Sequence, residues 1–136
     1  YFRTIDIPLN RDSKMSAFRA FKKADENLKE GKHLVIFPEG MISEYYPPVL
    51  QPFKNGPFKL AIENGVSILP VTIRNNWNLM WDDGKRHGST PGICDICIHA
   101  PIVTKEMKAA DAEELRDRVF NIINDSLLAH ENAEPK

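Results

Sequence analysis

The chain has 136 residues, of which 42% are hydrophobic and 27% charged, and its formal net charge is -1. This length suits one domain, and the composition is that of a globular rather than a disordered chain. A near-neutral balance argues against a strongly basic surface for nucleic acid. No apolar run approaches the roughly 18 residues that span a bilayer. Because the chain begins at Tyr1 rather than Met, we expect the coding sequence to extend upstream.

The first predicted element is a helix that Asp12 or Ser13 caps and Gly31 ends. Side chains at three- and four-residue steps predict one buried stripe, made of Met15, Phe18, Phe21, Ala24, Asp25 and Leu28. The apolar run His33–Phe37 follows and ends at Pro38. Such a run is typical of a strand buried on both faces of a helix-covered sheet.

A second helix is predicted from Gly56-Pro57 to about Gly65, since proline is favoured at the first helical position. Residues 67–73 indicate a strand in which Pro70 sits at an edge or a bulge. Residues 75–92 have no clear period and are interpreted as a long loop with room for a helical turn.

Residues 93–103 predict another strand, and Asp111 with Glu114 resembles a capping box for a final helix. The expected buried stripe of this helix is Leu115, Val119, Ile122, Ile123 and Leu127. Helices alternate with strands, which implies a layered α/β fold. We expect one domain over residues 1–130 and a frayed tail over 131–136.

Cys94 and Cys97 form a single CxxC pair. One such pair is weak evidence for zinc, and a redox pair needs a helix N-terminus. The flanking isoleucines favour a strand instead, so we interpret both as ordinary strand cysteines.

The segment with the strongest chemical signal is Phe37-Pro38-Glu39-Gly40, which places a carboxylate and a glycine directly after a predicted strand. Ligands of open α/β sheets bind at this edge, and glycine permits close approach. Without further context, ordinary turn chemistry is the favoured explanation of the same four residues.

Four landmarks in order over residues 5–73 resemble the glycerophosphate and lysophosphatidate acyltransferase family. Phe37-Pro38-Glu39-Gly40 is similar to the family's F-P-E-G-T-R-S signature, and residues 5–11 resemble its upstream block ending in arginine. Residues 52–58 are similar to its F-K-x-G-A-F stretch, and residues 68–71 to its apolar block around a proline. The resemblance implies a glycerol-3-phosphate acyltransferase-like fold, a mixed sheet flanked by helices, with the N-terminal part missing.

The resemblance also implies site roles. Arg11 would bind the head group of the acceptor, Glu39 would orient its hydroxyl, Gly40 would keep the loop open, and Lys54 would add positive charge. Plain surface roles for Arg11 and Lys54 stay open. The full set of candidate substrate-binding residues is Arg11, Phe37, Pro38, Glu39, Gly40, Ser43, Lys54, Gly56 and Pro70.

Two departures from the family pattern matter. Met41 and Ile42 replace its threonine and arginine, which removes a charge-assisted phosphate contact, although Ser43 is retained. Either Arg11, Lys54 or Arg74 supplies the cation, or the acceptor is not a simple lysophosphatidate. The family's catalytic histidine with an aspartate five positions later is absent: Pro38, Gly92, Thr104 and Pro135 follow the histidines at that spacing. We therefore assign no catalytic residue and expect the pair upstream of Tyr1.

The resulting hypothesis is part of an O-acyltransferase that moves an acyl group from a thioester, coenzyme A or carrier protein, to a lysophospholipid-like hydroxyl. No cofactor, metal or nucleic acid is expected. The parent would be peripheral to the inner face of the membrane, with Tyr45, Tyr46, Trp77 and Trp81 as minor interfacial candidates. The alternative is a non-catalytic lipid-binding or interaction domain of the same fold. Either way, we expect an open sheet edge or helix face.

Overall fold

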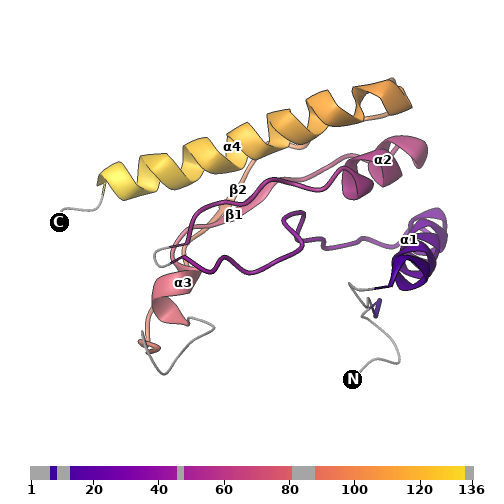
Figure 1. The fold of residues 1–136 in the computed structure, drawn as a ribbon. Helices are drawn as coiled ribbons and strands as arrows, with labels where there is room; N and C mark the ends of the chain where they lie inside the picture. Colours follow the sequence, from indigo (N-terminus) through magenta and orange to yellow (C-terminus); the bar gives the residue numbers. More distant parts are fainter. Residues whose placement is uncertain (1–6, 9–12, 46–47, 81–87, 134–136) are drawn as a thin grey trace.

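The computed structural model describes residues 7–8, 13–45, 48–80 and 88–133. Its elements, in chain order, are α1 (Lys14–Lys29), α2 (Gly56–Glu63), β1 (Val71–Ile73), α3 (Asn76–Leu79), β2 (Ile96–Ile98), the 3-10 turn η1 (Ala109–Asp111) and α4 (Ala112–Ala133). Figure 1 shows α4 along one side, α2 and the β1–β2 ribbon beneath it, and α1 beyond α2.

Both ends of α1 follow from the sequence. Ser13 is the N-cap, and its hydroxyl accepts a hydrogen bond from the Ser16 N–H at 3.2 Å. Gly31 follows the helix with a φ of 79°, a left-handed conformation that glycine adopts without steric cost. The predicted helix and its limits are confirmed.

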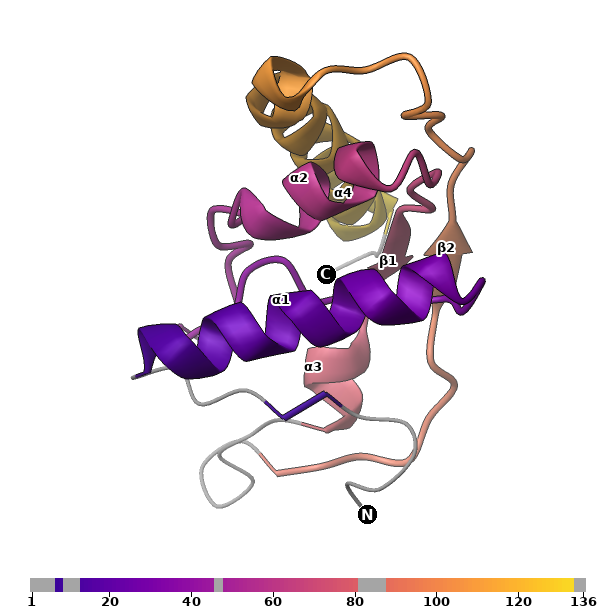
Figure 2. The ribbon, with the colours of Figure 1, turned by 90° about the vertical axis from the view of Figure 1, so that its right-hand side faces the viewer.

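The predicted burial of the α1 stripe is wrong for most of its members. Phe18 is 67% exposed and Met15 60%, whereas Ala24 is buried. In Figures 1 and 2, α2 lies between α1 and α4, so α1 stands on the outside of the layer that holds the core. The periodicity identified an apolar face correctly, but only part of it packs against other described residues: Ala24 is buried, while Met15 and Phe18 stay exposed.

The predicted strand at His33–Phe37 is also wrong. These residues are extended without a ladder partner, and Val35 is 88% and Phe37 75% exposed. A strand forms only where a neighbouring strand accepts and donates its backbone hydrogen bonds. The sheet seen in the described ranges consists of β1 and β2 alone, so this apolar run has no strand beside it.

The hydrophobic core lies between α2, α4 and Ile102, which follows β2. Its buried members are Phe53, Phe58, Ile62, Ile102, Ala112, Leu115 and Val119. Phe53 stacks on Phe58 and meets the Phe120 ring edge-on at a centroid distance of 5.1 Å. The start and proline of α2 are confirmed, as is its end near Gly65, where φ is 61°.

The sheet is a short antiparallel pair in which Thr72 lies opposite Cys97. An isolated bridge pairs Ile68 with Ile102 further along. Between these pairings two residues, 69 and 70, face three, 99–101, so the extra residue of the bulge is in the partner segment and Pro70 lies opposite it, at the bulge as predicted. The Pro70 carbonyl still accepts from the His99 N–H at 3.0 Å.

The final helix begins at Ala112, directly after Asp111, so its predicted start is confirmed. Asp111 Oδ2 accepts from the Lys108 N–H at 2.7 Å, so Asp111 closes the η1 turn rather than acting as the first residue of a capping box with Glu114. The stripe is confirmed at its first two members, because Leu115 is 1% and Val119 3% exposed, and its other three members are half-buried. The helix extends to Ala133, three residues into the predicted tail.

The remaining elements match their predictions in outline. The 75–92 segment contains the one-turn helix α3, and residues 81–87 lie outside the described ranges. Cys97 is in β2, whereas Cys94 precedes the strand and is exposed. Helices on a small antiparallel sheet give the layered α/β arrangement, with a sheet smaller than the sequence suggested.

Candidate functional site

The four-residue signature forms a tight turn. The Gly40 N–H donates to the Phe37 carbonyl at 3.3 Å, with Pro38 and Glu39 at the two central positions. Proline suits the first of these positions because its φ is already fixed. Gly40 has a φ of 68°, which a side chain would strain. The sequence therefore dictates a turn that presents the Glu39 carboxyl beside an open backbone.

Two hydrogen bonds fasten this turn to the segment that leads into α2. The Lys54 N–H donates to the Pro38 carbonyl at 2.8 Å, and the Gln51 N–H donates to Glu39 Oε2 at 2.7 Å. The second bond is charge-assisted when Glu39 is ionised, which makes it one of the stronger kinds. Glu39 is half-buried, so its carboxylate is held in one orientation at the edge of the fold.

Lys54 brings a cation to the same place. Its side chain crosses Gly40: a Cβ added to that glycine would lie 3.8 Å from Lys54 Cγ and 3.9 Å from Cε. The residue is exposed. A carboxylate that accepts hydrogen bonds and an ammonium that attracts anions therefore stand on adjacent sides of one glycine.

Ser43 lies just beyond the turn. Its hydroxyl oxygen accepts from the Tyr45 N–H at 3.2 Å and from the Val49 N–H at 3.4 Å. Because the oxygen is taken up by backbone donors, the structure gives Ser43 a role in shaping the chain after the turn.

Gly56 serves the contact between α1 and α2. A Cβ at this position would overlap Cζ of the Phe21 ring, so the ring rests directly on the glycine backbone. The preceding Asn55 accepts from Arg116 at 2.8 Å and donates to Glu113 at 3.3 Å, which ties the start of α2 to α4. Gly56 thus lies two residues from Lys54 in a packing position.

The other candidate cations differ in availability. Arg74 donates to Asp95 at 3.3 Å and to the Ser126 hydroxyl at 3.2 Å, which holds it against α4. Arg11 lies outside the described residues. Of the candidate cations that the structure describes, Lys54 is the one beside the turn. Pro70 is buried opposite the bulge, and its carbonyl bonds to the His99 N–H rather than to the turn.

Three of the four histidines fall in described ranges. His33 is exposed next to the extended run, His99 shares a 2.8 Å hydrogen bond with Thr72, and His130 lies 3.3 Å from Asp95. His87 lies outside. Within the described ranges no group of His, Cys, Asp and Glu has the arrangement of a metal site.

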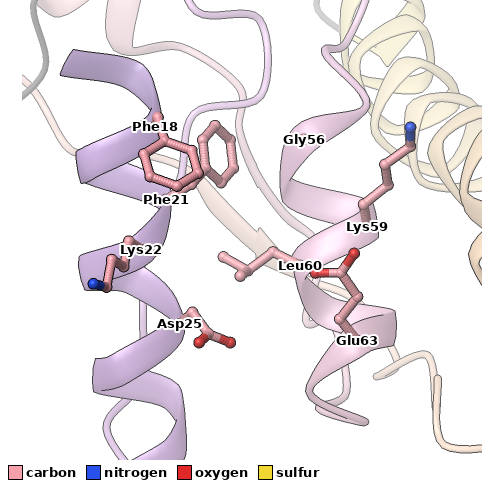
Figure 3. A pocket seen from close by; sticks show the side chains of 8 residues that line it. All are labelled: Phe18, Phe21, Lys22, Asp25, Gly56, Lys59, Leu60 and Glu63. Carbon is pink, nitrogen blue, oxygen red and sulfur yellow. The ribbon is translucent and has the colours of Figure 1, made fainter. Parts of the chain in front are cut away.

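An open groove of ≈ 350 Å³ separates α1 from α2 (Figure 3). Phe18, Phe21 and Leu60 supply its apolar lining, and Lys22, Asp25, Gly56, Lys59 and Glu63 complete it. Glu39, Gly40 and Lys54 do not line it, so the groove and the turn are separate features.

Asp25 at this groove links the two helices. It accepts from Lys29 at 2.6 Å and from the Asn64 amide at 2.9 Å. The Lys29 ammonium, followed by the Asn64 amide, lowers the pKa of Asp25 below its ordinary value, because both donors favour the ionised form.

The class of protein follows from this geometry together with three comparisons. Residues 3–74 match the protein family described as Acyltransferase. A 1-acyl-sn-glycerol-3-phosphate acyltransferase of Borreliella burgdorferi is 41% identical over 127 residues, covering 90% of this chain and 46% of that protein. A chloroplastic enzyme of the same description from Brassica napus is 31% identical over 121 residues, covering 89% of this chain and 33% of its own length.

The crystal structure of PlsC from Thermotoga maritima, a 1-acyl-sn-glycerophosphate acyltransferase, superposes with a TM-score of 0.73 at 30% identity, covering 87% of this chain and 46% of that one. The chain belongs to the Acyltransferase family. It is similar throughout to acyltransferases of phospholipid biosynthesis, and it spans less than half the length of each of these relatives.

The residues predicted to contact a membrane are described only in part. Of the membrane candidates, Tyr45 is 67% exposed and Trp77 half-buried, while Tyr46 and Trp81 lie outside the described ranges. No helix among the described residues is long and apolar enough to cross a membrane. Gln51 was not among the predicted site residues, because it contributes a backbone N–H, and a backbone N–H leaves no side-chain signal in a sequence.

Proposed function

We propose that this chain supplies the acceptor-handling part of a lysophosphatidate-type acyltransferase. The observation that carries the proposal is the joint placement of Glu39 and Lys54 around Gly40. An acceptor of this class has a hydroxyl and a phosphate monoester, so it needs a hydrogen-bond acceptor and a cation a few ångströms apart. Lys54 fills the place of the family's arginine, which Ile42 replaces here.

The chemistry divides between residues inside and outside this segment. The acceptor hydroxyl attacks the thioester carbonyl, its proton passes to a base, and the thiol leaves. Glu39 accepts a hydrogen bond from the acceptor and thereby orients the attacking oxygen, while Lys54 offsets the phosphate charge. His99 and His130 are bonded to Thr72 and Asp95, and none of the four histidines has the family's aspartate spacing.

The donor and setting are inferred from the same family. We assign an acyl thioester, on coenzyme A or a carrier protein, as donor, with no further cofactor. A lipid acceptor places the enzyme at a membrane surface, and we propose the inner face, with exposed Tyr45 as a minor contact.

The test is binding of a soluble acceptor to this chain. Isotope-labelled protein is titrated with 1-hexanoyl-sn-glycerol 3-phosphate, and amide shifts are followed at Glu39, Gly40 and Lys54. We expect saturable shifts that Lys54→Ala weakens at least about tenfold, since one phosphate ion pair is removed. Lys59→Ala, in α2, is the matched control and should leave the affinity unchanged. An equal loss of affinity in both variants, or no saturable shift in the unsubstituted 136-residue chain, would refute the proposal.

A non-catalytic lipid-binding or interaction role is favoured by one observation, the apolar lining of the α1–α2 groove. It predicts that a fluorescent fatty acid binds the chain and that Phe18→Asp abolishes this binding. If the acceptor shifts at Gly40 are absent while the fatty acid binds, the second role replaces the first.

A further inference from the structure

The Glu39 carboxylate is held by contacts with residues that follow the turn. Its Oε2 accepts from the Gln51 N–H at 2.7 Å, across twelve residues of sequence. Its Oε1 has no hydrogen-bond partner among the described residues. One oxygen is therefore committed to the protein, and the other is left for a ligand.

Gln51 is itself fixed by its neighbours. It precedes Pro52, which restricts its backbone to extended conformations. Its side-chain amide also donates to the Val49 carbonyl at 2.9 Å. The Gln51 backbone N–H, which donates to Glu39, is consequently restrained by its own neighbours.

Ser43 connects this donor to the turn. Its hydroxyl oxygen accepts from the Val49 N–H, and Val49 in turn receives the Gln51 side chain. A continuous series of contacts therefore runs from Ser43 through Val49 and Gln51 to the Glu39 carboxylate. Ser43 lies only three residues after Gly40, so the series returns to the turn from which it began.

We propose that Ser43 and the backbone N–H of Gln51 are positioning groups for Glu39. They hold Glu39 Oε2 so that Oε1 faces the hydroxyl of the acceptor. The assignment rests on the proposed acceptor role of Glu39. It makes the specificity of the turn depend on residues beyond Gly40, and it gives Ser43 a task other than direct contact with substrate.

The experiment follows the Gln51 amide proton by NMR as the pH falls from about 7 to about 3, the range in which carboxyls take up protons. An amide that donates to a carboxylate moves upfield when that carboxylate is protonated, so we expect a large titration at Gln51. Glu39→Gln should abolish it, because an amide side chain does not titrate in this range.

Two pairs of variants separate positioning from general packing. Ser43→Ala should reduce the Gln51 titration by half or more, and Ser43→Thr, which keeps the hydroxyl, should restore it. Gln51→Ala keeps the backbone N–H, so the amide of residue 51 should still titrate, whereas Gln51→Pro removes that donor and is compared through acceptor binding. Far-UV circular dichroism and the dispersion of the remaining amide signals check that each variant is folded.

Two results would overturn the proposal. A Gln51 amide that does not titrate in the folded parent chain excludes the bond to Glu39, and an unchanged titration in Ser43→Ala excludes the role of Ser43. The acceptor role is judged separately by 1-hexanoyl-sn-glycerol 3-phosphate. If the titration behaves as expected but no variant alters acceptor binding, the positioning contacts stand and the acceptor role of Glu39 falls.

Discussion

At the residue scale, Glu39 combines a structural contact with an available oxygen. Gln51 occupies Oε2, and the side chain sits at a turn rather than in the core. The sequence alone predicted a turn that carries the Glu39 carboxylate, because Pro38 and Gly40 on either side of it favour a turn. It did not predict the donor, because the Gln51 backbone N–H is common to every residue except proline.

The first prediction concerns the charge of Glu39. Glu39→Gln keeps an oxygen that accepts from Gln51, so the free energy of unfolding should change by less than about 1 kcal/mol. In an acyltransferase that contains this segment and a catalytic histidine, kcat/KM should fall at least about tenfold, or about 1.4 kcal/mol. Glu39→Ala should lower both quantities. Near-normal kinetics for the glutamine variant would demote Glu39 to a turn residue.

The second prediction concerns the ionisation of Asp25. Its pKa is lowered by Lys29 and then by Asn64, so its folded pKa lies below the unfolded one. The stabilisation is present above the unfolded value, about 3.9, and is lost as the pH falls through the lowered folded pKa. Carboxyl NMR should place the titration of Asp25 below that of a model peptide, and Lys29→Ala should raise it more than Asn64→Ala. The reverse order would contradict the assigned causes.

At the scale of elements, α1 shows where a periodic pattern stops being informative. Ser13 and Gly31 fixed its ends correctly, whereas the burial of Phe18 depended on what lies beside the helix. The run His33–Phe37 failed for the same reason, since a strand requires neighbours that its own residues do not specify. By contrast, Leu115 and Val119 in α4 are buried as predicted, because α2 lies against them.

The third prediction tests the contact between α1 and α2. A methyl at Gly56 would overlap the Phe21 ring, which is 40% exposed and would have to move. Gly56→Ala should therefore cost about 1 kcal/mol of stability, the loss of one partly buried aromatic contact. In a Phe21→Ala background the same substitution should be neutral or stabilising, since alanine is the better helix former. Additive effects in this double-mutant cycle, measured by urea unfolding, would show that the ring does not rest on the glycine.

At the scale of the whole molecule, the exposed apolar surface on α1 and on residues 35–37 matches the open face expected from the sequence. The core of α2, α4 and Ile102 is nevertheless continuous, so the chain has a folded centre with one uncovered side. Family membership was recognisable because the landmarks are local and ordered along the chain. The extent of the uncovered side was not, because it depends on contacts between distant parts of the fold.

The fourth prediction is that this chain alone transfers no acyl group. No histidine in it precedes an aspartate at the family's spacing, and removing the general base from comparable enzymes costs several orders of magnitude in rate. Thiol release from an acyl-coenzyme A in the presence of 1-hexanoyl-sn-glycerol 3-phosphate should stay at background. Turnover that His99→Ala or His130→Ala abolishes would contradict this and would identify a base within the chain.

The fastening of the turn also has a consequence for folding. Glu39 meets Gln51 and Pro38 meets Lys54 over short stretches of chain, whereas Asn55 reaches Arg116 across 61 residues. Closing a short loop takes on the order of 10–100 ns and costs less entropy than closing a long one. The turn at residues 37–40 can therefore assemble before the core between α2 and α4 exists. A peptide of residues 36–56 should already show part of the titration of the Gln51 backbone amide.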